Sequence, residues 1–462
     1  MEKVQKAGRR INKKIKAFFG IADAGFSFMT FVETSYFTPF LTNYALLPNA
    51  LIVLITTVTG VADIISSLLA GVFLDKSNLK WGKYRSWLLV GPPLVVLFYI
   101  FQFTNIGSPT VASIIISLGF IISHTIWNIS WTANMSLVSV LTEDPQERAF
   151  LSSRRAAGST VGKVAASYLT MPIVLFFTGI FGEGSSLGFT ATAGIFALVM
   201  MITYIIHFAI SKGYEEPVVD SNADTRAQTK RGPSITDMFR SVFSNKNLVL
   251  FVVSDFTKLI GYYLLMAASF YYFNYVTNSM ALQPVFLLVF NIAGFLGAIL
   301  SPRIVGKLGT KLTYLLGMGG YAASIIISYF LAENVIAVIT IMGIGQLFFG
   351  FSYGLTSSFY SNGATYSQWK TGKDTKGIIM AFSGFSIKVS ILVRGLILTA
   401  GIAALGFDAK VENVSPEILT GFKNIFFIAP FLFALVAFVI MFFYNLPDSK
   451  VREMESEIAS RK

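Results

Sequence analysis

The fold is decided by a polar stretch that reads Gln368-Trp369-Lys370-Thr371-Gly372-Lys373-Asp374-Thr375-Lys376-Gly377. It separates two apolar runs, residues 335–361 and 378–404, and each is long enough to cross a membrane as a helix. Two other polar stretches, residues 75–87 and 141–148, lie between long apolar runs in the same way. Short charged loops between long apolar runs are typical of a polytopic helical membrane protein.

The composition supports this prediction. Hydrophobic residues make up 54% of the chain, charged residues only 13%, and the mean hydropathy is +0.65, whereas soluble domains carry about 25% charged residues. We therefore predict an all-α membrane protein with twelve transmembrane helices, each long enough to cross about 30 Å of hydrocarbon. The twelve apolar runs span residues 17–44, 49–74, 86–104, 110–139, 153–181, 186–211, 247–277, 281–301, 312–331, 335–361, 378–404 and 421–445.

The net charge of +12 is distributed as expected for a membrane protein rather than a nucleic-acid-binding protein. Apart from four basic residues within the spans, only Lys410 and Lys423 lie in or beside a loop that follows an odd-numbered span. The other 30 lie in the tails and in or beside loops that follow even-numbered spans. This positive-inside pattern predicts a multi-pass protein of the plasma membrane, with lipid contacts and both termini in the cytoplasm.

Several classes of function are excluded by what the sequence lacks. The chain has no cysteine, which rules out disulfides and thiolate metal sites. Its two histidines, His124 and His207, are too few for a histidine-rich metal site. No nucleophile elbow, P-loop or HExxH motif is present. We therefore expect neither an enzyme nor a bound cofactor.

A long polar stretch, residues 212–246, separates six spans from six. Its glycine, proline and short polar residues predict a linker, with a surface helix beginning at Ser234. The predicted parts are a basic tail at 1–16, a six-helix lobe at 17–211, the linker at 212–246, a second six-helix lobe at 247–445 and a tail at 446–462.

Ionisable residues within the spans are costly, because one charge at the bilayer centre costs about 2.5–3.5 kcal/mol on insertion scales. We therefore expect them to face the bundle interior, paired or beside water. Asp255 and Lys258, three residues apart on one helix, are predicted to pair. The eight residues are Asp23, Glu33, Asp63, Lys163, Asp255, Lys258, Lys388 and Arg394.

The three polar loops and the sequence Phe19-Gly20-Ile21-Ala22-Asp23-Ala24-Gly25 resemble those of the glycoside–pentoside–hexuronide:cation symporters. This family is the melibiose permease branch of the major facilitator superfamily. The resemblance covers nearly the whole chain. It implies two pseudo-symmetric six-helix lobes, a monomer, a small sugar or sugar-acid substrate, and transport coupled to a cation by alternating access.

The second span carries a sequence, residues 60–71, that resembles the family's cation motif Arg-x-x-Asp-x-x-x-Asp-Pro-x-x-Gly. Asp63 matches the first acid, but Ser67 replaces the second acid. The resemblance implies cation-coupling roles for Asp63, Ser66, Ser67 and Thr125. Because a hydroxyl in place of a carboxylate weakens a sodium site, we expect the coupling cation to be a proton rather than sodium.

The fourth span contains residues 124–131, His-Thr-Ile-Trp-Asn-Ile-Ser-Trp, which resemble the family pattern Tyr-Thr-x-x-(Asn/Asp)-Ile-Pro-aromatic. Amide groups bind sugar hydroxyls and an aromatic face stacks on the sugar ring. An alternative for Trp127 and Trp131 is that they only pack helices together. An alternative to Arg155, as the arginine that enters the binding cavity, is Arg154. The substrate-binding residues that the resemblance implies are Asp23, Ser27, Asn128, Trp131, Thr132, Arg155, Lys388 and Arg394.

Arg394 stands where the family usually has a small residue. A guanidinium stays charged within the membrane, so it needs an acid, water or an anionic ligand nearby. Glu33 is the candidate acid, and a carboxylated sugar is the candidate ligand.

The sequence leaves two kinds of substrate open. The leading hypothesis is a glycoside, pentoside or hexuronide. The alternative is an amphipathic lysolipid- or sterol-like ligand, which the 44 phenylalanines would suit. A receptor or intramembrane enzyme would need a signalling domain or a catalytic group of residues that the sequence does not show.

Overall fold

The computed structural model describes residues 11–77, 79–142, 144–182, 184–215, 242–372, 376–411 and 414–460. These residues form helices and connecting loops, with no strand among them. Parts of the predicted features lie outside the described residues: the N-terminal tail up to residue 10, the linker from 216 to 241 with Ser234, residues 373–375, 78 and 143 of the three polar stretches, and residues 461–462 of the C-terminal tail.

The chain divides into two compact units, Met1–Ser221 with Asp408–Lys410, and Asn222–Phe407 with Val411–Lys462. We call them the N-terminal and C-terminal lobes. The helices of the N-terminal lobe are α1 (Lys13–Phe18), α2 (Ile21–Pro39), the π-helix η1 (Phe40–Tyr44), α3 (Asn49–Lys76), α4 (Trp87–Gln102), α5 (Pro109–Leu141), α6 (Pro145–Phe181) and α7 (Leu187–Ile210).

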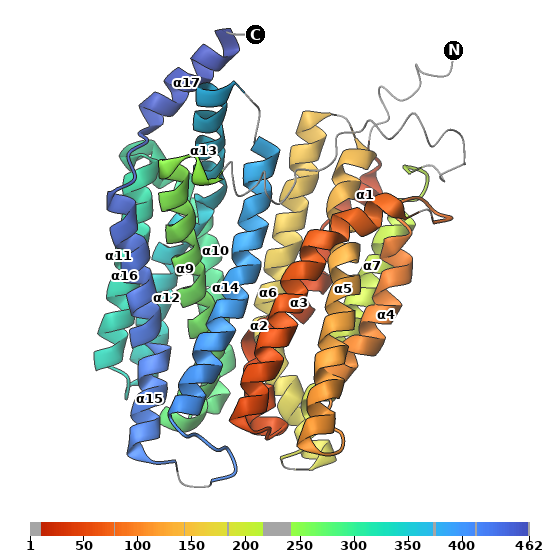
Figure 1. The fold of residues 1–462 in the computed structure, drawn as a ribbon, viewed down its shortest axis with the longest axis vertical. Helices are drawn as coiled ribbons and strands as arrows, with labels where there is room; N and C mark the ends of the chain where they lie inside the picture. Colours follow the sequence, from red (N-terminus) through yellow and green to blue (C-terminus); the bar gives the residue numbers. More distant parts are fainter. Residues whose placement is uncertain are drawn as a thin grey trace. The chain divides into compact units, whose positions relative to one another are not determined.

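The C-terminal lobe contains the other helices, of which those named α are labelled in Figure 1. They are α9 (Lys246–Tyr271), the π-helix η2 (Tyr272–Val276), the short η3 (Met280–Leu282), α10 (Gln283–Leu308), α11 (Thr310–Phe330), α12 (Val335–Gly354), α13 (Thr356–Thr371), α14 (Lys376–Ala404), α15 (Pro416–Phe426), α16 (Ile428–Phe442) and α17 (Asp448–Ser460).

The helices match the predicted membrane spans. Among the described residues, eleven helical segments are long and apolar enough to cross a membrane, with α12–α13 and α15–α16 each forming one segment. The remaining predicted span is α4, which is apolar but has only 16 residues. Two predicted loops are partly helical, because α6 already begins at Pro145 and α13 continues to Thr371. The protein is therefore an integral, multi-pass membrane protein.

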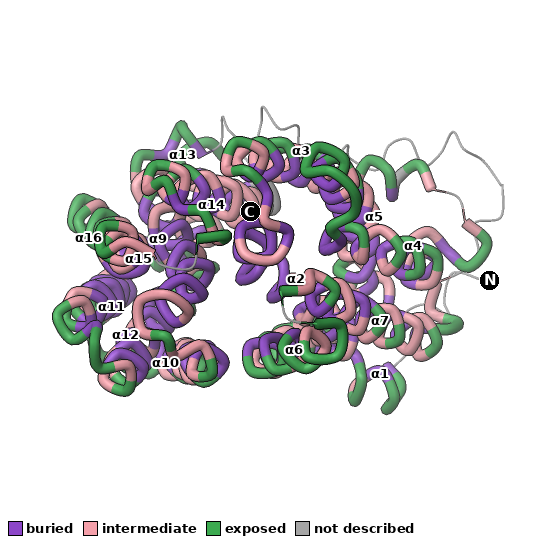
Figure 2. Tube along the Cα trace, turned by 90° about the horizontal axis from the view of Figure 1, so that it is seen from below, coloured by how far each residue is buried: buried purple, intermediate pink, exposed green. Residues whose placement is uncertain are grey.

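The surfaces of the helices also fit a membrane. Several helices turn buried residues to one side and exposed residues to the other (Figure 2). The exposed side carries large apolar side chains, among them Val161, Phe176, Ile299 and Phe330. Such apolar faces would be unfavourable in water and are expected to contact lipid.

The two lobes repeat one packing scheme. In the N-terminal lobe α2 packs on α6 and α7, α3 packs on α5, and α4 packs on α5 and α7. In the C-terminal lobe the corresponding helices make the same pairs: α9 packs on α14 and α16, α10 on α12, and α11 on α12 and α16. Each lobe is therefore a six-helix unit with the same topology, as the major facilitator fold requires.

The repeat extends to a local detail of the backbone. The first span of each lobe ends in a five-residue π-helix, Phe40–Tyr44 in one and Tyr272–Val276 in the other. Two residues after the π-helix, each lobe has a non-glycine residue with positive φ, Leu46 at 51° and Asn278 at 49°. Because residues with side chains seldom adopt this conformation, the shared feature is specific evidence of internal symmetry.

A close approach of α2 and α6 fixes the interior of the N-terminal lobe. A Cβ added at Gly158 would overlap the carbonyl oxygen of Gly20, and one added at Gly162 would overlap that of Ala24. Gly158 and Gly162 are four residues apart, so both lie on one face of α6. Small residues at this spacing let helix backbones pack closely in membranes, where helix association depends on van der Waals contact.

Carboxylates fasten the loops at one end of each lobe. The Glu215 carboxylate accepts hydrogen bonds from the backbone N–H groups of Tyr84 (3.0 Å) and Arg85 (2.8 Å). Burial lowers the pKa of the Arg85 guanidinium, although the nearby Glu215 opposes this shift. In the C-terminal lobe, Asp448 accepts a hydrogen bond from the backbone of Thr310 at 2.8 Å. In both lobes an acid that follows the last span therefore holds the loop between the second and third spans.

The α2–α6 contact predicts a position-dependent effect of adding one methyl group to α6. Gly158→Ala should lower the free energy of unfolding by roughly 1–3 kcal/mol, because the added Cβ forces the two backbones apart. Gly179→Ala on the same helix is the matched control, since its Cβ would meet no atom within 4 Å. Thermal unfolding of detergent-purified protein, followed by tryptophan fluorescence, measures both. Equal stability of the two variants would contradict the close contact.

Candidate functional site

The first polar group in the N-terminal lobe is centred on Asp23. Arg155 of α6 binds this carboxylate with two hydrogen bonds, Nη2–Oδ1 at 2.6 Å and Nε–Oδ2 at 3.0 Å. Asn134 of α5 donates a third, from Nδ2 to Oδ2 at 3.4 Å. A bidentate guanidinium–carboxylate pair is strong and fixed in orientation. Asp23, only 5% exposed, is thus held with its charge compensated.

Ser27 extends this group by one turn of α2. Its hydroxyl donates to the carbonyl of Asp23 at 2.8 Å and lies 2.9 Å from the hydroxyl of Ser159 on α6. Arg154 is exposed, with its guanidinium over the ring of Phe150 at 5.1 Å. Of the two arginines weighed from the sequence, Arg155 is therefore the one that reaches the buried acid. We call Asp23, Ser27, Asn134, Arg155 and Ser159 the Asp23 cluster.

The second polar group joins α3 to α5. Asn128 donates from Nδ2 to Oδ1 of Asp63 and to Oγ of Ser66, both at 2.9 Å. Ser66 in turn donates to the carbonyl of Asp63 at 3.1 Å. All three side chains are buried. We call Asp63, Ser66 and Asn128 the Asp63 cluster; it brings a residue expected to bind sugar into contact with the expected cation motif.

The other hydroxyls of the expected cation site bond to their own helices. Ser67 donates to the carbonyl of Ile64 at 2.8 Å, and Thr125 donates to that of Ile121 at 2.8 Å. Thr132 likewise donates to the carbonyl of Asn128 at 2.7 Å. Ser66 rather than Ser67 thus shares the amide of Asn128 with Asp63.

Aromatic rings lie beside these two clusters. Trp131, which is half-buried, stacks on Phe26 with ring centroids 6.1 Å apart. Phe26 also meets Trp127 edge-on at 4.7 Å. Trp127 is buried and contacts Phe26 of α2 and Tyr99 of α4, so it packs helices together. Trp131 is less buried and keeps part of its surface accessible.

Glu33 lies near a histidine of its own lobe. Its carboxylate lies 4.0 Å from Nε2 of His124, and both side chains are buried. The imidazole is held between the rings of Phe120 and Trp127, at 3.7 and 4.5 Å. Arg394 belongs to the other lobe, so its pairing with Glu33 stays a prediction.

The C-terminal lobe contributes the remaining expected site residues. Lys388 and Arg394 both lie on α14, where Lys388 is half-buried and Arg394 is buried. Six of the eight predicted intramembrane charges are buried, Lys388 is half-buried, and Lys163 is exposed; the buried ones are Asp23, Glu33, Asp63, Asp255, Lys258 and Arg394.

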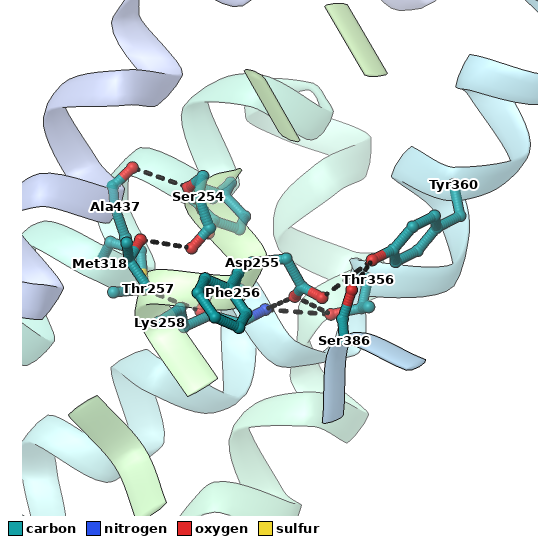
Figure 3. Close-up of polar contacts among 12 residues, drawn as sticks. Ser254, Asp255, Phe256, Thr257, Lys258, Met318, Thr356, Tyr360, Ser386 and Ala437 are labelled. Carbon is teal, nitrogen blue, oxygen red and sulfur yellow. Dashed lines mark hydrogen bonds and ion pairs between the residues drawn. The ribbon is translucent and has the colours of Figure 1, made fainter. Parts of the chain in front are cut away.

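The same lobe contains a buried ion pair that the sequence predicted. Nζ of Lys258 lies 2.6 Å from Oδ1 of Asp255, which confirms that pairing. Tyr360 donates to Oδ2 of Asp255 at 3.3 Å and lies 3.2 Å from the hydroxyl of Ser386 (Figure 3). With Thr356, these residues form the Asp255 cluster, which connects α9, α13 and α14.

Several of these polar residues were not predicted from the sequence as members of a site. Asn134 could have been found, because Trp127, Trp131 and Asn134 share one face of α5 at the spacing i, i+4, i+7. Ser159 could also have been found, four residues after Arg155 on α6. Thr356, Tyr360 and Ser386 gave no such signal, because they meet Asp255 only through the packing of separate helices.

The arrangement suits recognition of a polar solute rather than covalent chemistry. The Asp23 cluster presents a fixed carboxylate and guanidinium beside hydroxyl groups, which can together accept from and donate to a ligand with many hydroxyls. The Asp63 cluster presents a carboxylate that accepts a hydrogen bond from the amide of Asn128, and such a carboxylate can carry a proton. α5 supplies a residue to each cluster, and so links them through one rigid helix.

Comparison with known proteins agrees with this fold. The chain is 27% identical over 413 residues to a glucuronide carrier protein homologue of Escherichia coli strain K12, covering 87% of this chain and 86% of that protein. It is also 27% identical to a putative sulfoquinovose importer of Salmonella typhimurium strain LT2, covering 98% and 94%. These matches do not favour a lysolipid- or sterol-like substrate.

Solved structures show the same architecture. A D-xylose–proton symporter superposes with a TM-score of 0.66 at 13% identity, covering 95% of this chain and 98% of that chain. At this identity the likeness shows the fold alone. It confirms the major facilitator fold expected from the sequence.

The chain also matches a family model of transporters. The model describes MFS/sugar transport proteins and covers residues 18–448 of this chain. The match spans both lobes, and the relatives are membrane transporters rather than enzymes. The chain therefore belongs to the MFS/sugar transport protein family.

Proposed function

We propose that this protein is a secondary active transporter that moves a glycoside, pentoside or hexuronide together with a cation, by alternating access. One observation carries the proposal: α5 supplies Asn128 to the buried Asp63 cluster and Asn134 to the buried Asp23 cluster. A cation bound at one cluster would change the position of a helix that serves the other. This is the thermodynamic coupling that symport needs.

The coupling cation in this proposal is a proton. Asp63 provides one carboxylate, and the residue four positions on, Ser67, turns its hydroxyl to the carbonyl of Ile64. A sodium ion prefers several oxygen ligands, whereas one proton needs only one carboxylate oxygen. Asp63 is therefore the proton-carrying residue, and its protonation would change the hydrogen bond that its carboxylate accepts from Asn128.

The sugar in this proposal binds at the Asp23 cluster, beside Trp131. Asp23 and Arg155 offer an acceptor and donors in fixed positions, and the half-buried face of Trp131 offers a stacking surface. Lys388 and Arg394 on α14 are the other basic residues that the family resemblance implies for substrate binding. The names of two relatives, a glucuronide carrier homologue and a putative sulfoquinovose importer, favour sugars with an acidic group. Basic residues would compensate that charge.

The orientation and environment follow from the charge pattern. With the basic tail and the even-numbered loops in the cytoplasm, both termini lie inside the cell. The transporter works as a monomer in the plasma membrane, with lipid around its apolar faces.

Uptake into proteoliposomes tests the function directly. Radiolabelled glucuronide, sulfoquinovose and xyloside should exchange across the membrane in counterflow, and at least one should accumulate when an inward proton gradient is imposed. A sterol or lysolipid probe serves as the alternative substrate. Failure of every sugar in counterflow, with purified protein that unfolds cooperatively, would overturn the proposal.

The role of Asp63 predicts a loss of coupling without a loss of binding. Asp63→Asn should abolish proton-driven accumulation and leave counterflow at a substantial fraction of the wild-type rate, because the carboxamide cannot carry the proton. Ser67→Ala is the matched control and should keep accumulation, since its hydroxyl bonds only to its own helix among the contacts described. Strong, saturable stimulation of wild-type uptake by sodium at fixed pH would contradict proton coupling.

The role of the Asp23 cluster predicts a difference between two neighbouring arginines. Arg155→Lys should raise the KM for sugar exchange by about tenfold or more, because lysine cannot reproduce the bidentate geometry. Arg154→Lys, at an exposed position, should leave KM within about twofold of wild type. The measurement is counterflow at a range of sugar concentrations. Equal KM values for the two variants would exclude Arg155 from the sugar site.

A further inference from the structure

We propose that Lys258 is a tethered cation: its ammonium group fills a monovalent-cation site in the C-terminal lobe. This inference concerns the Asp255 cluster and does not depend on the proposed sugar or on the coupling cation. The site would take a small monovalent cation or a primary ammonium ion whenever the lysine side chain is absent.

The surroundings of the ammonium have the composition of a cation site. Nζ lies 2.6 Å from Oδ1 of Asp255 and donates to the hydroxyl of Thr356 at 3.0 Å. The rings of Tyr314 and Tyr353 lie below it, with centroids at 5.5 and 5.8 Å. Carboxylate and hydroxyl oxygens together with aromatic faces are groups that attract cations. The lysine side chain is 0% exposed, so water does not solvate this charge.

The carboxylate has hydrogen-bond partners besides the ammonium. Thr356 donates to Oδ1 of Asp255 at 3.4 Å, and Tyr360 donates to Oδ2 at 3.3 Å. Tyr360 is itself in contact with Ser386 of α14 (Figure 3). Two residues of α13 therefore keep the oxygen ligands in position, and α14 supports one of them through Ser386. This distinguishes a preformed binding site from an ion pair whose two partners only hold each other.

The position of Thr356 at the start of its helix agrees with a cation site. Thr356 is the first residue of α13, directly after the interruption at Leu355 that separates α13 from α12 within one membrane segment. Interrupted transmembrane helices recur at the ion sites of transporters, because the freed backbone and side-chain groups can serve as ligands. In this chain the residue that follows such an interruption, Thr356, accepts a hydrogen bond from the ammonium group of Lys258.

The site has a consequence for coupling. A lysine that fills it supplies one positive charge permanently, and no cation from solution has to enter the C-terminal lobe. The lobe also keeps a fixed anchor on α14 through Tyr360 and Ser386, whichever cations the solution contains. Coupling to a mobile cation then falls to the N-terminal lobe alone.

Chemical rescue of Lys258→Ala tests this inference. The alanine keeps Cβ, and n-propylammonium matches the three carbons and the ammonium that the substitution removes. Purified Lys258→Ala protein should unfold at a lower temperature than wild type, and propylammonium should raise its Tm saturably by about 2 °C or more. Wild-type protein, whose site is filled, should not respond. Sodium should act in the same direction with a smaller effect, and tetramethylammonium, which is too bulky, should have none.

The double variant Asp255→Asn with Lys258→Ala is the matched control. Removing both charges leaves no buried anion, so this protein should be more stable than Lys258→Ala and should ignore propylammonium. If the single variant cannot be purified alone, it is purified with propylammonium in every buffer and then dialysed, and loss of folded protein on dialysis is the expected result. A destabilised single variant with no cation response, or an equal response of the double variant, would show a purely structural ion pair and overturn the proposal.

Discussion

The structure depends on one constraint: charges within hydrocarbon must be compensated close to where they lie. Each uncompensated charge at the bilayer centre costs about 2.5–3.5 kcal/mol on insertion scales. The N-terminal lobe meets the constraint by pairing Asp23 with Arg155, and the C-terminal lobe by pairing Asp255 with Lys258. The two solutions differ in kind. The first joins two helices, α2 and α6, whereas the second uses residues of one helix and ties them to α13.

Close backbone contact makes the first solution work. Gly20 and Ala24 meet Gly158 and Gly162 where α2 crosses α6. Asp23 and Arg155 lie beside this contact in sequence, so their side chains meet over a short distance with good geometry. Wider spacing of the two backbones would lengthen both hydrogen bonds and leave the carboxylate partly uncompensated. The close packing of α2 on α6 therefore sets the geometry of the ion pair between Asp23 and Arg155.

The sequence predicts most of the fold, because hydrophobic length is the dominant signal for a membrane helix. It fails at helix ends: Pro145 already lies in α6 and Thr371 still lies in α13. Polar residues continue a helix beyond the membrane as readily as they end it. The pairing of Asp255 with Lys258 was predictable because both lie on one helix face. The contacts of Asp63 with Asn128 and of Glu33 with His124 were not, since they depend on how separate helices rotate against each other.

The π-helices at the ends of α2 and α9 have a consequence for the symmetry of the two lobes. A π-turn closes its hydrogen bonds one residue later than an α-turn, so it accommodates one extra residue in the helix. Both lobes contain this extra residue at the end of their first span, followed at the same interval by a residue with positive φ. The extra residue is therefore part of the scheme that the two lobes share, and removing it from one lobe alone would break the match between their first spans.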